Sequence, residues 1–259
     1  MTTTEPGVVS TVENGVLRVV IDRPASLNAV RAETLDSIAD AFEKHSADPD
    51  ARVAVLSGAG RAFCTGADLA GLDLSAAPSP VIIDAANRAA DRIRAFPQPV
   101  IGAVKGPAAG VGVSLALACD LTVASESSYF LLAFTRVGLM PDGGATALVA
   151  ASIGRARAMA LALLAERLGA AEALDAGLIA QVYTDDEFDT EVEALAGRLA
   201  EGPALAFHKT KAAINAATLG QLDKAFERER EGQLELLAAA DFAEGVDAFQ
   251  NKRPARFGR

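Results

Sequence analysis

The sequence contains few cysteines, few histidines and a minority of basic residues. Its two cysteines lack the spacing of a disulfide framework, which indicates a reducing compartment, and we therefore expect a cytoplasmic protein. The 24 lysines and arginines are outnumbered by 34 aspartates and glutamates, so the net charge is −10. This charge argues against nucleic acid or an anionic membrane surface as the main partner, although a local basic patch could still bind a phosphorylated ligand.

Uninterrupted apolar runs are short as well. The longest lies between Gly106 and Cys119 and is too short to span a membrane, so it predicts a buried core helix. The first six residues, Met-Thr-Thr-Thr-Glu-Pro, lack the basic and apolar regions of a signal peptide. We therefore expect no membrane partner.

Only two histidines are present, which argues against histidine-based catalysis. His45 ends a predicted helix near Asp48 and Asp50, and His208 lies in a late helical region. No motif places either side chain, and both are expected to be solvated. Ser114 lacks the flanking glycines of a nucleophile elbow, so a Ser-His-Asp triad is not expected. No spacing of His, Cys and Asp suggests a metal site.

The 259 residues are enough for one large domain or for a core with an appendage. Residues 8–21 alternate in polarity and are interrupted by Asn14-Gly15, the strongest short signal for a β-hairpin. Apolar patterns predict buried strands at 53–57 and 100–104 and helices at 31–46 and 81–95. Strands followed by helices, repeated along the chain, indicate an α/β fold.

The second part of the chain is predicted to be helical throughout. Ala-rich segments indicate helices at 155–165, 170–177, 188–200, 203–217 and 221–240. The mixed-charge run from Asp223 to Glu231 is typical of a solvated helix face. Residues 73–80, with Ser, Ala and Pro, are expected to form a mobile loop.

Two glycine-containing segments are candidates for ligand binding. The first, Arg61-Ala-Phe-Cys-Thr-Gly-Ala-Asp-Leu69, follows a predicted strand, and its small residues would let a ligand approach backbone N–H groups. In the second, Gly110 and Gly112 stand where an apolar helix begins, and the free N–H groups of a helix start could stabilise an oxyanion. Taken alone, the first segment is better explained as an ordinary strand-to-helix turn, and close packing would explain the glycines of the second. A dinucleotide fingerprint is excluded because position 115 is Leu115.

The third segment is Val137-Gly-Leu-Met-Pro-Asp-Gly-Gly144, which places Asp142 in a Pro-Asp-Gly-Gly turn. Turn chemistry alone would explain an aspartate there. Its apolar neighbours would nevertheless raise the pKa of the carboxyl, which suits a general base or acid. Asp120, at the end of the apolar helix, is expected to be structural and to bond backbone groups.

Together with Arg23-Pro-Ala-Ser-Leu-Asn-Ala29 and Glu244-Gly-Val-Asp-Ala-Phe-Gln-Asn-Lys-Arg-Pro254, these three segments resemble the crotonase (enoyl-CoA hydratase/isomerase) family. The resemblance covers nearly the whole chain. It implies a spiral of ββα units over residues 1–200 and a C-terminal helical trimerisation region over 201–259. It also implies an acyl-CoA substrate, with coenzyme A as part of the substrate and no separate cofactor.

The resemblance further implies a homo-trimer or homo-hexamer. Apolar residues after position 200 agree with this, because they form more apolar surface than a small appendage should leave exposed. They are Leu205, Phe207, Ile214, Leu222, Phe226, Leu234 and Leu237.

The resemblance also assigns site residues. By position, the backbone N–H groups of Ala67 and Val111 would hold the thioester oxygen. Arg23 and Lys252 are candidates for the phosphate contacts, the latter from a neighbouring subunit in one arrangement. The other candidates for substrate binding are Ala25, Ala62, Thr65, Gly66, Asp68, Leu69, Gly110 and Phe134. Ala70 and Gly71 stand where many members carry a charged residue, and Phe134 would narrow the pocket toward short or shaped acyl groups.

The positions of the catalytic acidic residues distinguish the reactions of the family. Its hydratases place glutamates at the positions of Ser114 and Phe134, and neither is present here. One isomerase subgroup uses an acid at the position of Asp142. The resemblance therefore implies a Δ3,Δ2-type enoyl-CoA isomerase with one carboxylate. The alternatives are a hydratase or another lyase of the family with a different acid, and a non-catalytic acyl-CoA-binding protein.

Overall fold

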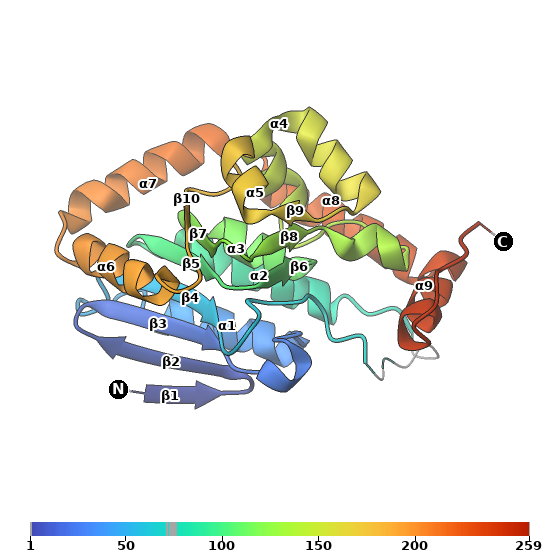
Figure 1. Cartoon of the computed structure of the whole chain (residues 1–259), viewed down its shortest axis with the longest axis horizontal. Helices are drawn as coiled ribbons and strands as arrows, with labels where there is room; N and C mark the ends of the chain where they lie inside the picture. The colour runs from blue at the N-terminus through green and yellow to red at the C-terminus, as the bar shows by residue number, and fades with distance from the viewer. Residues whose placement is uncertain (1, 71, 73–76, 259) are drawn as a thin grey trace.

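A seven-stranded sheet forms the centre of the protein in the computed structural model, which describes residues 2–70, 72 and 77–258 (Figure 1). The first three strands are antiparallel and the others join in parallel. In order across the sheet the strands are β1 (Thr2–Glu5), β2 (Val8–Glu13), β3 (Val16–Ile21), β4 (Val53–Gly58), β5 (Val100–Val104), β7 (Leu121–Ser125) and β10 (Gln181–Tyr183).

The predicted hairpin is confirmed. β2 and β3 pair from Val8 opposite Ile21 to Glu13 opposite Val16, and Asn14 and Gly15 form the connection with positive φ angles of 52° and 81°. Two successive positive φ angles match the right-handed twist of a hairpin, and Asn-Gly adopts them at low cost.

The predicted strands and helices of the first hundred residues are also confirmed. β4 and β5 form where expected, and α1 (Ala32–Lys44) and α2 (Val81–Ala95) pack against each other on the sheet. Helix α1 buries Leu35, Ile38 and Phe42, which recur at helical spacing on its inner face. Residues 71 and 73–76, which include Gly71 and part of the expected loop, lie outside the described residues, and residues 77–79 are exposed.

A second, three-stranded sheet lies beside the first and shapes the site. It consists of β6 (Pro107–Ala109), β8 (Tyr129–Leu131) and β9 (Leu168–Gly169). The chain repeatedly passes from the large sheet to the small one and then into a helix: β5, β6 and α3 (Val111–Ala118) make one such unit, and β7, β8 and α4 (Ala145–Leu164) the next. Every residue of α3 is buried, as expected for the longest apolar run.

The expectation that the chain is purely helical after residue 154 is wrong. β9 and β10 lie in that region, and β10 extends the large sheet beside β7. With two and three residues, these strands are too short to show an alternating pattern. The helices of this region are α5 (Ala170–Ala176), α6 (Phe188–Ala200), α7 (Ala204–Thr218), α8 (Leu222–Leu237) and α9 (Ala240–Gln250).

Helix α4 starts ten residues before its predicted beginning, and Gly154 interrupts it with φ 74° and ψ 164°. Among the helices of the described residues, α4 is the one whose length and apolar character would allow it to cross a membrane, with a mean hydropathy of 1.6. Its broken backbone at Gly154, followed directly by Arg155 and closely by Arg157, argues against such a span. We therefore interpret α4 as a surface helix.

Two close contacts bring the C-terminal helices onto the core. A Cβ on Gly245 of α9 would lie 2.5 Å from Val137 Cα, in the short 3₁₀ helix η2 (Ala133–Val137). A Cβ on Gly144 would lie 2.7 Å from Leu222 of α8. Only glycine permits such approaches, so α8 and α9 pack directly on the segment that contains Asp142. The division of the chain at residue 200 stays a prediction.

Candidate active site

The segment that follows β4 runs side by side with β6, just before the start of α3. Cys64 N donates to Pro107 O (3.2 Å), and Ala109 N donates to Cys64 O (2.8 Å). A Cβ on Gly110 would lie 3.4 Å from Gly66 Cα. Gly66 and Gly110 both have positive φ, 99° and 54°, so glycine is required at this crossing. Gly66 and Gly110 are in close contact at this crossing, so the residues that follow them, Ala67 and Val111, lie on neighbouring backbones.

The N–H groups of Ala67 and Val111 have no acceptor among the residues that the structure describes. Val30 N donates to Gly66 O (2.8 Å) and Asp68 N donates to Val30 O (2.9 Å), so the Ala67 N–H between these bonds points away from Val30. Val111 is the first residue of α3, where N–H groups lack intrahelical partners and the helix dipole is positive. Two such donors can hold a developing oxyanion.

The turn that contains Asp142 packs against the first turns of α3. The hydroxyl of Ser114 donates to the carbonyl oxygen of Asp142 (2.6 Å). A Cβ on Gly143 would lie 2.9 Å from Ser114 Cβ and 3.5 Å from Val111 Cγ2. The acid candidate and one oxyanion donor therefore lie on neighbouring, tightly packed segments. Ser114 has a structural role here, since it fixes the backbone of this turn.

The carboxyl group of Asp142 is buried. Its Oδ2 accepts a hydrogen bond from Gln233 Nε2 of α8 (2.8 Å), and its Oδ1 has no partner among the described residues. Burial raises the pKa of Asp142 to about 7, the hydrogen bond from Gln233 opposes this rise, and the charge of Glu229 adds to it. A carboxyl group with a pKa near neutrality can both take and return a proton, as the sequence predicted for this residue.

Glu229 and Gln233 are site residues that the sequence analysis missed. The prediction of a solvated face for 223–231 is wrong at Glu229, which is completely buried. Glu229 accepts hydrogen bonds from Gly144 N (2.7 Å), from Thr146 N (2.9 Å) and from the Thr146 hydroxyl. A signal was present, because Glu229 and Gln233 continue the buried face of α8 at helical spacing from Leu222.

Arg23 and Asp68 are joined in an ion pair. Arg23 Nη2 lies 3.0 Å from Asp68 Oδ2, and Arg31 Nε lies 3.0 Å from the same oxygen. Although burial favours a higher value, the hydrogen bonds from both arginines hold the pKa of Asp68 below its usual range. Arg31, which the sequence analysis did not select, is the more exposed of the two arginines, with 60% of its side chain accessible.

The small residues before the crossing serve local structure. The Thr65 hydroxyl donates to Leu27 O (3.1 Å), and Ala62 O accepts from Asn28 Nδ2 (2.6 Å). These bonds tie the segment after β4 to the 3₁₀ turn η1 (Pro24–Ser26), which contains Ala25. The result is a fixed path for the backbone that leads to Gly66.

The crossing has three further candidate residues near it in the sequence or the fold: Leu69, Phe134 and Lys252. Leu69 O accepts from Gln250 Nε2 at the end of α9 (3.1 Å), and Lys252 is exposed two residues further on. Phe134 is 8% exposed, and its Cζ would lie 4.0 Å from a Cβ on Gly110. The Phe134 ring therefore lies close to the Gly110 turn.

Other polar residues singled out from the sequence have structural partners. Asp120 accepts from Val100 N (2.8 Å) and pairs with Lys211 (2.7 Å), which confirms its structural role. The expectation of solvated histidines is wrong, because both are partly buried. His45 Nδ1 lies 2.9 Å from Asp48 Oδ2, and His208 Nδ1 lies 3.0 Å from Pro97 O.

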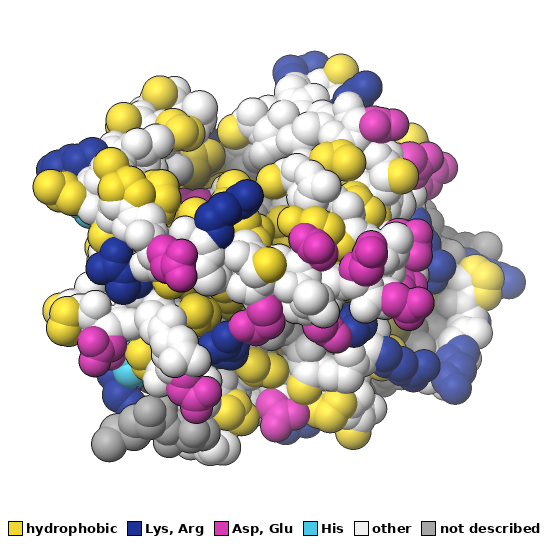
Figure 2. Space-filling model, turned by 60° about the vertical axis from the view of Figure 1, so that its left-hand side comes forward, with side chains coloured by type: hydrophobic (Ala, Val, Ile, Leu, Met, Phe, Trp, Pro, Cys, Tyr) yellow, Lys and Arg dark blue, Asp and Glu magenta, His cyan; other side chains and the backbone are white. Residues whose placement is uncertain are grey.

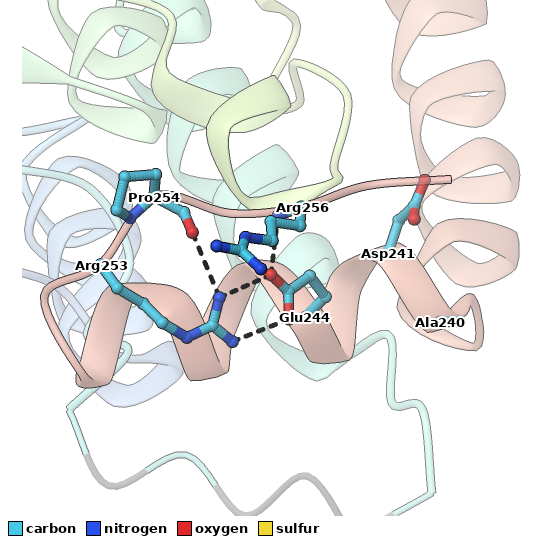
Figure 3. Close-up of a pocket in the computed structure, with 6 residues that line it drawn as sticks. All are labelled: Ala240, Asp241, Glu244, Arg253, Pro254 and Arg256. Carbon is cyan, nitrogen blue, oxygen red and sulfur yellow. Dashed lines mark hydrogen bonds and ion pairs between the residues drawn. The ribbon is translucent and has the colours of Figure 1, made fainter. Parts of the chain in front are cut away.

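A cavity of about 580 Å³ lies between α9 and the chain that follows it (Figure 3). Arg253 crosses it and pairs with Glu244, whose pKa this hydrogen bond lowers to about 2. None of its lining residues belongs to the crossing of Gly66 and Gly110. They are Ala240, Asp241, Glu244, Arg253, Pro254 and Arg256.

Comparison with known proteins agrees with this geometry. A sequence model described as enoyl-CoA hydratase/isomerase matches residues 11–259. A Rhodobacter capsulatus protein described as a probable enoyl-CoA hydratase is 41% identical over 251 residues, 95% of each chain. The 1,2-epoxyphenylacetyl-CoA isomerase of Escherichia coli is 38% identical over 255 residues, 96% of this chain and 97% of that one.

A solved structure is similar over the whole chain. The crystal structure of an enoyl-CoA hydratase from Mycobacterium avium subsp. paratuberculosis superposes with a TM-score of 0.92 at 51% identity, covering 99% of this chain and 100% of that one. The fold and the relatives define an α/β enzyme. The chain belongs to the enoyl-CoA hydratase/isomerase family, the crotonase family, and the spiral of ββα units expected from the sequence is confirmed.

The raised pKa of Asp142 leads to a prediction about stability. In the unfolded chain the Asp142 carboxyl ionises near its ordinary pKa of 3.8, whereas in the folded protein it keeps its proton to about pH 7. The folded state therefore binds the extra proton, and the stability that this provides is present below about pH 4 and lost as the pH rises through about 7. Asn cannot ionise. As the pH is raised from about 4 to about 8, the free energy of unfolding of Asp142→Asn should therefore rise by about 2–4 kcal/mol relative to that of wild type.

Urea unfolding at a series of pH values measures this difference. Asp175→Asn, at an exposed aspartate of α5, is the matched control and should show no such trend. A constant difference between Asp142→Asn and wild type over this pH range would contradict the raised pKa.

Proposed function

We propose that this protein is an acyl-CoA isomerase that moves a double bond from C3=C4 to C2=C3 of an enoyl-CoA thioester. The backbone N–H groups of Ala67 and Val111 hold the thioester oxygen, and Asp142 moves the proton. The observation that carries the proposal is a buried carboxyl group of raised pKa in a turn that packs against Val111.

The reaction needs one carboxylate. Ionised Asp142 removes a proton from C2, and the electrons of that C–H bond pass into the thioester, whose oxygen becomes negatively charged. The two N–H donors stabilise this dienolate; losing one such donor typically costs roughly 3–4 kcal/mol of barrier. The protonated Asp142 then returns the proton to C4, which restores the carbonyl and leaves the double bond at C2=C3. Coenzyme A takes part only as a portion of the substrate.

The acids of the chain favour this reaction over hydration. Positions 114 and 134 hold serine and phenylalanine, and the Ser114 hydroxyl is already bonded to Asp142 O. Glu229 is the other carboxylate beside Asp142, but donors from Gly144 and Thr146 occupy it. The isomerase named among the relatives, at 38% identity, agrees with this proposal, whereas the hydratases named at 41% and 51% identity support the alternative of hydration with another acid.

A non-catalytic acyl-CoA-binding protein is the alternative of another class. Keeping a carboxyl group buried with a raised pKa lowers the stability of the folded protein at neutral pH. A binding protein gains nothing from that loss, whereas a general base requires it. The aspartate therefore favours an enzyme.

A product assay tests the proposal. The protein is incubated separately with a 3-enoyl-CoA and a 2-enoyl-CoA, and the products are followed by ultraviolet absorbance and mass. We expect conversion of the 3-enoyl-CoA at unchanged mass and little addition of water to the 2-enoyl-CoA. Rapid hydration without isomerisation would contradict the proposal and support the hydratase alternative.

We also propose that the protein forms a homo-trimer or homo-hexamer, with apolar helix surface in the contacts. Helix α7 buries none of its residues within the chain, and Leu205 and Ile214 are 72% and 56% exposed. Hydrophobic side chains are frequent on the upper part of the face in Figure 2. Leu222, which the sequence assigned to the same contacts, is instead buried within its own chain.

Sedimentation should therefore show a trimer or hexamer at micromolar concentration, because exposed Leu and Ile side chains gain by burial between subunits. The double variant Leu205→Asp/Ile214→Asp should sediment as smaller species, while a double substitution of exposed polar positions on the same helix, Lys209→Asp/Thr210→Asp, should disturb assembly less. A stable monomer of the unaltered protein would contradict this proposal.

A further inference from the structure

Helix α8 carries two buried polar side chains, Glu229 and Gln233, one helical turn apart on the same face. Burying polar groups is costly unless they are hydrogen-bonded. Both side chains meet this requirement through the segment from Met140 to Thr146, in which Asp142 lies. The helix therefore contacts the acid-bearing turn through polar groups at two points.

Gln233 uses both halves of its amide group. Its Nε2 donates to Asp142 Oδ2 (2.8 Å), and its Oε1 accepts from Met140 N (3.4 Å). The Met140 N–H can only donate, so the amide oxygen must face it and the NH₂ group must face Asp142. Close packing keeps this arrangement in place, since a Cβ on the neighbouring Gly232 would lie 2.4 Å from Met140 Sδ.

Glu229 holds the other end of the turn. It receives the N–H groups of Gly144 and Thr146 and the Thr146 hydroxyl, at the start of α4. Burial raises the pKa of Glu229, and the hydrogen bonds from Thr146 and Gly144 oppose the rise. Because the three groups hydrogen-bonded to Glu229 all donate and the N-terminus of α4 is positive, the carboxylate form is the one that fits.

We infer that α8 is the positioning element of the site: Gln233 holds Oδ2 of Asp142, so that Oδ1 is the oxygen that exchanges the proton, and Glu229 anchors the turn. This inference rests on the proposed role of Asp142 as the base. Oδ1 is the carboxylate oxygen without a partner among the described residues, which is what a proton-accepting atom requires. Gln233 and Glu229 are positioning residues, because they act through Asp142.

The two residues act on the proton affinity of Asp142 in opposite directions. Gln233 donates to the carboxylate form and lowers its pKa, whereas the negative charge of Glu229 raises it. From α3 the Asp142 turn receives only the neutral Ser114 hydroxyl, and Arg228 of α8 acts on Glu229. Removing the two side-chain functions singly should therefore shift the pH dependence of the reaction in opposite directions.

The test compares pH–rate profiles on a 3-enoyl-CoA for three α8 variants. Gln233→Met keeps the length of the side chain but cannot donate a hydrogen bond to Asp142. The acidic limb of the pH–rate profile should therefore move to higher pH by about one unit, with a lower kcat and little change in KM. Glu229→Gln removes the charge and should move the limb down by about one unit. Glu231→Gln, at an exposed position of the same helix, is the control. It should change neither the pH–rate profile nor kcat.

Opposite shifts in the two buried variants support the inference. Shifts in the same direction, or no shift in either variant, overturn it. Asp142→Asn is assayed alongside and separates this inference from the proposed function. If Asp142→Asn keeps its activity, the proposed function has failed; if Asp142→Asn is inactive while neither α8 variant shifts the limb, only the positioning role has failed.

A second measurement does not depend on the stability of an α8 variant. In wild-type protein labelled on glutamine side chains, one amide resonance should titrate with the midpoint of the pH–rate profile, because the Gln233 NH₂ group bonds to the titrating carboxyl. The same resonance should not titrate in Asp142→Asn. The absence of any glutamine amide with this behaviour would overturn the inference.

Discussion

Replacing Asp142 by Asn is expected to lower turnover of a 3-enoyl-CoA by roughly 10²- to 10⁴-fold, the usual worth of general acid–base catalysis. Asn keeps the shape of the side chain, and its amide oxygen can still accept the hydrogen bond that Gln233 donates to Asp142, but it cannot take a proton. The backbone donors of Ala67 and Val111 are untouched, so acyl-CoA binding should survive. Steady-state kinetics gives the rate, and calorimetry with a saturated acyl-CoA gives the affinity.

Asp175→Asn is the control for this variant, because Asp175 is exposed on α5 away from the turn. It should leave kcat and KM unchanged. Isomerase activity in Asp142→Asn within a few-fold of wild type would contradict the assignment of the base, and the acid would then have to be sought elsewhere, beginning with Asp68.

Val111→Pro is expected to lower kcat by roughly 10²- to 10³-fold, because it deletes one of the two N–H donors. Val111 is the first residue of α3, and proline is tolerated at this position since its N–H has no intrahelical partner. Gly110, with its positive φ, precedes it and has the conformational freedom that a residue before proline needs. The substitution therefore removes the donor while the helix can persist.

Val111→Ala is the matched control, since it removes the side chain that packs near Gly143 but keeps the N–H group. It should cost far less activity than Val111→Pro. Circular dichroism establishes that both variants are folded. If both lose activity equally, the effect comes from packing, and the Val111 N–H is not an oxyanion donor.

The first hundred residues could be predicted closely from the sequence because their signals are local. Asn14-Gly15 defines a hairpin through backbone preferences alone, and α1 and α2 show apolar residues at helical spacing. β9 and β10 could not be predicted, because so few residues show no periodicity and the strands form only through pairing with β8 and β7. Tertiary contacts, rather than local preference, determine such strands.

The same contrast holds within the site. Asp142 stands out in the sequence because its apolar neighbours lie within a few residues. Glu229 and Gln233 lie 85 and 91 positions from their partners Gly144 and Asp142, so no local pattern connects them. In the sequence of a mixed-charge run, a buried glutamate cannot be told from a solvated one by its neighbours. Only its position on the buried face of α8 distinguishes Glu229. That face could have been recognised by extending the apolar periodicity from Leu222.

The most direct test of the central claim follows the proton itself. A 3-enoyl-CoA deuterated at C2 is converted in ordinary water, and the product is analysed by mass spectrometry and NMR. If Asp142 alone takes the proton from C2 and returns it to C4 inside a buried site, part of the product should carry deuterium at C4, with no gain of mass from water. A product heavier by one water molecule, or a product without deuterium at C4 even at the earliest stage of the reaction, would contradict transfer by a single buried carboxylate.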